Sequence, residues 1–245
     1  MKSLGLVGFG QFGRLAARLL KAHFEVMVTD SAPGAKMAAR EAGVAFGTLE
    51  DVAAREVVVV AVPVAAMPAV FAALAAHLRP GTLVVDVGSV KMLPAQWMAE
   101  ILPAHVDLVA THPLFGPQSA KAGLAGLRFV ICPIRGDRHE RVAAFASSLG
   151  LTVTVTSAEE HDREMAYVQA LTHLIGRSLV NLGIPDEQLK TASYQHLLEL
   201  CSLIGADTFE LFTAIQTQNP FAAEVAGAFV DQARSLLEQV AAKRP

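Results

Sequence analysis

Short apolar runs alternate with alanine-rich stretches along the first 156 residues, and this alternation predicts an α/β fold. The strand candidates are residues 4–7, 25–29, 57–62, 83–87, 106–110, 128–132 and 151–155. Those before residue 112 are apolar almost throughout, which is typical of parallel strands covered on both faces. The crossover helix candidates are residues 12–22, 34–42, 66–78 and 94–102. We therefore expect a doubly wound, Rossmann-type parallel sheet.

The strand pattern ends near Thr156, and helical patterns follow. Ser157 and Glu160 have the spacing of a capping box, in which each side chain bonds the backbone N–H of the other residue. This box predicts the start of a long helix that runs to about Leu182, and Gly183 and Pro185 end it. Further helices are expected beyond. The chain is thus predicted to have two domains, residues 1–156 and an all-helical domain of residues 157–245.

Composition narrows the class of partner. The chain has 245 residues, 53% of them hydrophobic, and a net charge of −3 with scattered basic residues. No basic patch favours nucleic acid or an anionic membrane, so we expect neither as a partner and expect a small-molecule substrate. Two cysteines, Cys132 and Cys201, are too few for a disulfide framework. With no signal-like or membrane-spanning segment, a cytoplasmic location is expected.

A glycine-rich fingerprint directly follows the first predicted strand and opens the first helix. The expected cofactor contacts in it are Gly8, Phe9, Gly10, Gln11, Phe12 and Gly13. Its glycines allow a sharp turn and close approach to a pyrophosphate at a helix N-terminus. Asp30 ends the second strand at the distance expected for a ribose-binding carboxylate, and no arginine follows at once, so NAD is favoured over NADP. Val62 and Pro63, at the end of the third predicted strand, are also expected to contact the cofactor.

A candidate reaction centre lies at two other strand ends. His112 falls at or just past the carboxyl end of the run 106–110, and Pro113 holds it extended. Ser89 and Lys91 leave the preceding strand at the same edge of the sheet, where doubly wound folds bind ligands. A histidine there can accept a proton from a substrate hydroxyl as hydride leaves the same carbon. We expect His112 and Ser89 to be catalytic and Lys91 to bind substrate, with no metal site.

The long helix of the second domain carries a further pair. His173 and Arg177 are four residues apart and therefore share one helical face. A histidine on such a face is more often a core residue, but the neighbouring arginine favours a place in the cleft between the domains. Both are candidate substrate-binding residues.

Four segments together resemble the prephenate/arogenate (cyclohexadienyl) dehydrogenase family. They are residues 8–13, 86–91, 111–117 and 160–173, which include Glu160-His161-Asp162 and His173. The resemblance implies NAD(P)-dependent oxidative decarboxylation of prephenate or arogenate to 4-hydroxyphenylpyruvate or tyrosine, in tyrosine biosynthesis. It also implies that His112 deprotonates the ring hydroxyl, that Ser89 assists it, and that the helix with His173 lines the substrate pocket.

One position departs from this family pattern. Family members commonly carry a late arginine that pairs with the ring carboxylate, where this chain has Ala214. Of the remaining cations in the helical domain, Arg177 is the predicted replacement, with Lys91 or a partner-subunit residue as rivals.

Two other functions stay open on the sequence. One is a related two-domain NAD(P)-dependent dehydrogenase that acts on another hydroxy acid or imine. Such an enzyme would keep the cofactor site and change the residues that bind the substrate carboxylate. A noncatalytic NAD-sensing module would need no proton acceptor beside the nicotinamide. The presence of Ser89, Lys91, His112 and His173 together therefore argues against a sensing module.

The apolar residues of the helical domain recur near helical spacing from Leu197 onward. They predict a homodimer formed through that domain.

Overall fold

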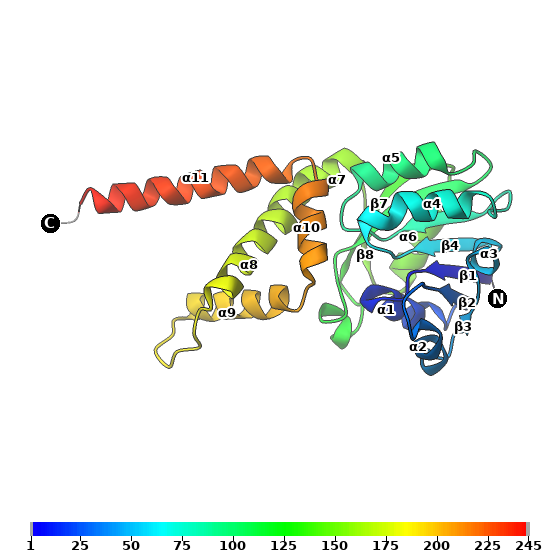
Figure 1. Cartoon of the computed structure of the whole chain (residues 1–245), viewed down its shortest axis with the longest axis horizontal. Helices are drawn as coiled ribbons and strands as arrows, with labels where there is room; N and C mark the ends of the chain where they lie inside the picture. The colour runs from blue at the N-terminus through cyan, green and yellow to red at the C-terminus, as the bar shows by residue number, and fades with distance from the viewer. Residues whose placement is uncertain (1, 244–245) are drawn as a thin grey trace. The chain divides into compact units, whose positions relative to one another are not determined.

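The structure is a computed structural model that describes residues 2–243 of the chain (Figure 1). Its contacts separate into two compact units, Met1–His161 and Asp162–Pro245. The division falls inside one helix, α7 (Ala158–Met165), a few residues beyond the boundary predicted from the sequence. Within residues 2–243, no helix is both long enough and apolar enough to cross a membrane.

The first unit is built on one sheet of eight strands in the order β3-β2-β1-β4-β5-β6-β7-β8. The strands are β1 (Lys2–Val7), β2 (Phe24–Thr29), β3 (Ala45–Phe46), β4 (Val57–Val60), β5 (Leu83–Asp86), β6 (Asp107–Pro113), β7 (Arg128–Arg135) and β8 (Thr152–Val155). The neighbouring pairs from β3 to β6 are parallel, so their carboxyl ends meet at one edge. The predicted fold class is confirmed by this sheet and the helical unit after it.

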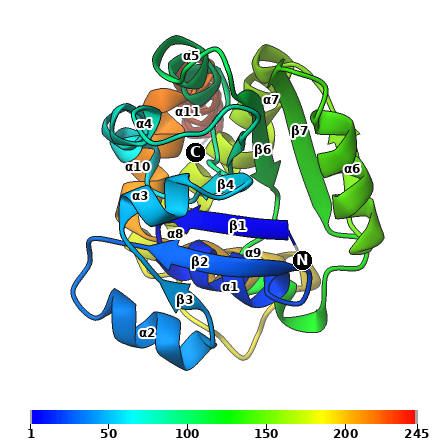
Figure 2. The ribbon, with the colours of Figure 1, turned by 90° about the vertical axis from the view of Figure 1, so that its right-hand side faces the viewer.

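Helices cover both faces of the sheet, as the apolar strands require. The helices of this unit are α1 (Gln11–Leu20), α2 (Ala35–Ala42), α3 (Leu49–Ala53), α4 (Met67–Ala75), α5 (Met92–Ile101) and α6 (His139–Ser148). Figure 2 shows α3, α4 and α5 on one side and α1, α2 and α6 on the other. Each side has its own buried cluster, centred on Phe71 and Met98 in one and on Leu6 and Phe9 in the other.

One strand pair departs from the parallel arrangement of the rest of the sheet, because β7 runs antiparallel to β6. A parallel return needs a crossover, usually a helix. The connection between these two strands holds only a short 3-10 helix, η2 (Ser119–Ala122), so the chain turns back beside β6.

One strand and two α-helices of this unit were not predicted from the sequence. β3 and α3 are too short to show a period, and in α6 alanine and serine weaken the hydrophobic repeat.

The second unit is all helical, and the helix that leads into it begins at the predicted capping box in the last residues of the first unit. Glu160 N donates to Ser157 Oγ at 3.1 Å and Ser157 N donates to Glu160 Oε2 at 3.2 Å. The long helix then continues through a π-helical segment, η3 (Ala166–Leu171), into α8 (Thr172–Leu182). The remaining helices are α9 (Ala192–Gly205), α10 (Phe209–Gln218) and α11 (Ala222–Ala241).

Close approach of α3 to the central strand β1 depends on Gly5. A Cβ atom at this position would lie 2.3 Å from the backbone oxygen of Val52 in α3. Real Cβ atoms do not come so close to a backbone oxygen, so a larger residue must push the helix away. The packing of α3 on β1 therefore requires glycine here.

We expect the change Gly5→Ala to lower the free energy of unfolding by about 1–3 kcal/mol, the usual cost of overpacking. Urea denaturation measures it. Gly205→Ala is the matched control, because its nearest neighbour, Val180 Cγ2, would be 3.8 Å away and alanine is the better helix former by about 1 kcal/mol. A Gly5→Ala protein as stable as the parent would contradict the requirement.

Candidate active site

A buried ion pair organises the edge where β5 and β6 end. Lys91 Nζ lies 2.5 Å from Asp86 Oδ2 and also donates to the carbonyl of Thr111 at 2.6 Å. Both charged side chains are fully buried. Thr111 Oγ1 donates to the carbonyl of Asp86 at 2.6 Å, and Gly88 N donates to Asp86 Oδ2 at 2.8 Å. This network joins two strand ends and the turn that holds Ser89.

The ion pair changes how Lys91 is interpreted. The sequence suggested a cation available to substrate, whereas the structure buries Lys91 completely and pairs it with Asp86. Removal of one partner of such a pair leaves a buried charge and costs about 3–5 kcal/mol. A structural role for Lys91 is therefore favoured, and its direct contact with substrate stays a prediction.

His112 is the penultimate residue of β6 and lies directly after Thr111 in this network. Its ring is 3% exposed, and Nδ1 is 2.8 Å from Nε2 of His161, which is also buried. Burial, the neighbouring His161 and the Lys91 cation all lower the pKa of His112 well below its usual value of 6.5. His112 is therefore neutral at physiological pH, the state in which an imidazole can accept a proton.

The glycine loop between β1 and α1 is shaped to receive an anion. Gly8 has φ +98°, and a Cβ on Gly13 would lie 2.1 Å from the carbonyl oxygen of Gly8. Space is open above Gly10, where a Cβ would meet no atom within 4 Å. No side chain caps the N-terminus of α1 and no acidic residue lies in its first turn. Its backbone N–H groups can thus bind a pyrophosphate.

Asp30 connects the glycine loop to the end of β2. Its Oδ2 accepts from Phe9 N at 2.5 Å and its Oδ1 accepts from Ala32 N at 2.6 Å. The carboxylate thus fixes the loop, and each oxygen keeps a lone pair for a ribose hydroxyl. In the loop after β4, Val62 packs beside Gly8, and Pro63 caps the start of the 3-10 helix η1 (Val64–Ala66). Ser89 is half-buried in the turn after β5.

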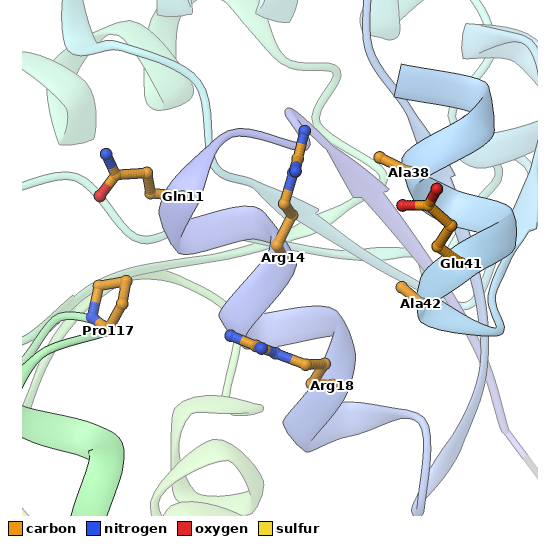
Figure 3. A pocket seen from close by; sticks show the side chains of 7 residues that line it. All are labelled: Gln11, Arg14, Arg18, Ala38, Glu41, Ala42 and Pro117. Carbon is orange, nitrogen blue, oxygen red and sulfur yellow. The ribbon is translucent and has the colours of Figure 1, made fainter. Parts of the chain in front are cut away.

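A hollow of about 410 Å³ opens between α1 and α2, as Figure 3 shows. Arg14 and Arg18 of α1 line it, with Glu41 of α2 across from them. Arg14 Nε donates to the carbonyl of Phe9 at 3.1 Å, so this guanidinium is tied to the same loop as Asp30. Sequence reasoning missed Arg14 because it looked for a cation only after Asp30. Its place directly after the fingerprint was the available signal.

In the helical unit, His173 and Arg177 are close to Asp207. Arg177 Nη2 donates to the carbonyls of Asp207 at 2.7 Å and Ile204 at 3.3 Å. His173 Nε2 lies 3.9 Å from Asp207 Oδ2. Burial lowers the pKa of His173, and Arg177 adds to this, while Asp207 opposes it. The contact between His173 and Asp207 is therefore not an ion pair at neutral pH.

Four polar side-chain atoms of the helical unit are buried without a partner among the described residues. They are Gln169 Oε1, His173 Nδ1, Arg177 Nε and Gln218 Oε1. Buried polar atoms normally find a partner in protein, water or ligand. The face of the helix that carries His173 and Arg177 therefore has unused hydrogen-bonding capacity.

Comparison with known proteins decides the family. A profile described as the nucleotide-binding domain of prephenate dehydrogenase matches residues 15–156, and one described as its dimerization domain matches residues 157–244. The chain belongs to the prephenate dehydrogenase family. The predicted membership is thus confirmed.

Individual relatives agree. Arogenate dehydrogenase 2, chloroplastic, of Arabidopsis thaliana is 33% identical over 232 residues, which cover 90% of this chain and 65% of that protein. Arogenate dehydrogenase 1, chloroplastic, of the same plant is 31% identical over 90% of this chain and 36% of its own length. Cyclohexadienyl dehydrogenase of Zymomonas mobilis is 31% identical over 74% of this chain and 67% of its own length. The chain thus spans less than two thirds of the length of both plant relatives.

The fold also matches solved members of the prephenate dehydrogenase family. The crystal structure of prephenate dehydrogenase from A. aeolicus in complex with hydroxyphenyl propionate and NAD+ superposes with a TM-score of 0.78. The match covers 99% of this chain and 92% of that chain at 19% sequence identity. At this identity the match establishes the fold.

His161 is the functional candidate that the predicted site left out. In the sequence it belongs to the Glu160-His161-Asp162 segment that carries the family resemblance, and that segment by itself assigns it no role. The structure brings its ring against His112, although the two residues are 49 positions apart in the chain. The segment itself was the available signal, because a histidine inside a family motif is a candidate for contact with the site.

We expect NMR titration of His112, assigned with the variant His112→Asn, to give a pKa below 6.5. His161→Leu should raise this pKa but leave it below 6.5, because burial is the larger cause of the shift and remains. The unfolded chain binds this proton near pH 6.5, so acidification below that pH should also reduce stability until the folded pKa is reached. A His112 pKa at or above 6.5 in the parent would contradict the neutral state.

Proposed function

We propose that this chain catalyses NAD-dependent oxidative decarboxylation of prephenate or arogenate, as part of tyrosine biosynthesis. The observation that carries the proposal is the burial of His112, which lowers its pKa, at the same sheet edge as the glycine loop. A nucleotide sensor has no use for such a proton acceptor. The names of the relatives support the substrate class, since arogenate and cyclohexadienyl dehydrogenases are among them.

The residues at the glycine loop fit NAD. The uncapped helix N-terminus and the open space above Gly10 suit the pyrophosphate, and Asp30 suits the ribose hydroxyls and repels a 2′-phosphate. The other residues that would hold the cofactor are Gly8, Phe9, Gln11, Phe12, Gly13, Val62 and Pro63. When bound, NAD supplies the acceptor for the hydride. Arg14, which is tied to the same loop, is the cation that could pair with the 2′-phosphate of NADP. Because Asp30 repels that phosphate, NADP is the less favoured cofactor.

His112 is the proposed general base. Its neutral ring accepts the proton of the substrate's ring hydroxyl. Because Nδ1 is engaged with Nε2 of His161, Nε2 of His112 is the nitrogen available for this task. The buried Asp86–Lys91 pair fixes the backbone on which His112 sits, and Ser89 in the adjoining turn assists with its hydroxyl. Loss of carbon dioxide then makes the substrate ring aromatic, so the protein mainly positions groups and accepts one proton.

Arg177 and His173 are the proposed substrate-binding residues. Substrate carboxylates need a cation or donors in a partly dry site, and Ala214 of α10 supplies neither. Arg177 keeps an unpartnered buried Nε, as His173 keeps Nδ1. Gln169 and Gln218 have acceptors that could take donors from the substrate or from water.

We also propose that the chain forms a homodimer through its helical domain, residues 157–245, which follows a dinucleotide-binding domain of residues 1–156. Helix α11 supports this assembly, because Leu236 is 52% exposed, Leu237 73% and Val240 58%. Apolar side chains so exposed along one helix favour burial against another chain. The description of the profile matched by residues 157–244 as a dimerization domain supports the same proposal.

The function is tested by NADH formation at 340 nm with prephenate and with arogenate, each with NAD and NADP. We expect activity with at least one substrate and a higher kcat/KM for NAD than for NADP.

The variant His112→Asn tests the general base. It should lower kcat by about two to four orders of magnitude with little change in NAD affinity, as loss of a general base does. The acid limb of kcat/KM should lie below pH 6.5, because the pKa of His112 is lowered. Near-normal kcat in His112→Asn would exclude it as the base.

Replacement of Arg177 tests the substrate contact. Arg177→Ala should raise KM for the substrate about ten- to a hundredfold, because a charge-assisted hydrogen bond contributes about 1.5–3 kcal/mol. NAD affinity should not change. Arg177→Lys, which keeps the charge, should recover part of the loss, and Lys190→Ala at an exposed position is the control. Thermal unfolding of each variant separates lost contact from lost structure, since Arg177 also bonds two carbonyls. An unchanged KM for both substrates would refute this role.

A further inference from the structure

A second and larger hollow lies in the sheet unit, and it borders the candidate active site only through Phe12 and Thr111. Its volume is about 660 Å³, and its walls are α1 and α6. Its floor is formed by strands β1, β4, β5, β6 and β7. Both helices cover the same side of the sheet, opposite to α4 and α5 (Figure 2).

The hollow is separate from the proposed base. Thr111 and Pro113 of β6 line it, and His112 stands between them in the strand. Successive side chains of a strand point to opposite faces, so the imidazole of His112 points away from this hollow. The pair His112–His161 therefore belongs to the other face of the sheet.

One end of the hollow is lined by charged side chains, and basic residues outnumber acidic ones there. Lys2 begins β1, Glu56 directly precedes β4, and Arg138 and Arg141 lie at the start of α6, all at the edge opposite the glycine loop. Arg138 is paired with Asp107 at 3.0 Å, and Glu56 Oε2 accepts from Ser3 N at 2.9 Å. The guanidinium of Arg141 has no partner among residues 2–243. This end thus offers an exposed, uncompensated cation.

The rest of the hollow is apolar and aromatic. Phenylalanines from five different segments line it, at positions 12, 24, 115, 129 and 145. Phe12 and Phe115 close the far end, below the glycine loop, with ring centroids 6.4 Å apart. A hollow of this size lies in the range of about 300–1,000 Å³ that small-molecule sites occupy.

We propose that this hollow binds an apolar carboxylate, with the hydrocarbon or aromatic body over the sheet and the carboxylate at Arg141. A neutral apolar molecule would leave Arg141 and Lys2 unused, and a polar anion such as a nucleotide would leave the phenylalanines without a partner. An amphipathic monoanion matches both ends. The proposal does not depend on the proposed dehydrogenase reaction.

The test uses two fluorescent probes with the same aromatic body. 1-Anilinonaphthalene-8-sulfonate carries an anionic head, and N-phenyl-1-naphthylamine lacks it. We expect saturable binding of the sulfonate, displaced by dodecanoate and not by NAD. Arg141→Gln should weaken the sulfonate about tenfold and leave the neutral probe unchanged, because only the charged contact is lost. Arg40→Gln, an equal change of charge at an exposed site on α2 outside the hollow, should change neither.

A second variant fills the space. Val142 lines the hollow from α6, and Val142→Trp should abolish binding of both probes while the circular dichroism spectrum and thermal midpoint stay near those of the parent. The proposal fails if the sulfonate does not bind, if NAD displaces it, or if Arg141→Gln leaves its affinity unchanged. Because Arg141→Gln alters only an exposed side chain, that last outcome decides the matter even if Val142→Trp does not fold.

Discussion

The buried pair of Asp86 and Lys91 is the interaction on which the candidate active site depends. Both charges are out of solvent, and their hydrogen bonds reach the end of β5, the Gly88 turn and Thr111 of β6. Such a pair is worth little as a source of stability, because desolvation offsets the attraction, yet it is costly to break. Its effect is therefore positional. It fixes two strand ends, which carry Ser89 and His112, and its cation helps to keep the pKa of His112 low.

Asp30 has two roles at the glycine loop: it holds the loop in shape, and it is the proposed partner of the ribose hydroxyls. Its two oxygens accept from Phe9 N and Ala32 N, so the loop is held in shape before any nucleotide arrives. Gly13 lets α1 start against the carbonyl of Gly8, which a side chain would not permit. A preformed loop of this kind reduces the ordering that binding would otherwise require.

The helical unit combines local order with unused capacity. The helix that leads into it starts at the Ser157–Glu160 box and passes through the π segment Ala166–Leu171. In this segment the carbonyl of Ala170 accepts from Gln216 Nε2 at 2.7 Å. π segments are frequent at functional sites. Here the segment ends two residues before His173, and unpartnered buried atoms lie within it, at Gln169, and after it, at His173 and Arg177. Together with the exposed apolar residues of α11, these features support the proposed roles of this unit in substrate binding and dimer formation.

The sequence by itself determined the features that local pattern controls. The apolar strands, the glycine turn, the capping box and the place of His112 at a strand end all depend on residues within a few positions of one another. Only the tertiary structure decided the antiparallel direction of β7, the burial of Lys91 and the contact of His161 with His112. These depend on residues far apart in the chain: Lys91 contacts Thr111 where two strands end, and His161 of helix α7 contacts His112 of strand β6. Spacing along the chain does not encode such contacts, because the fold alone brings these segments together.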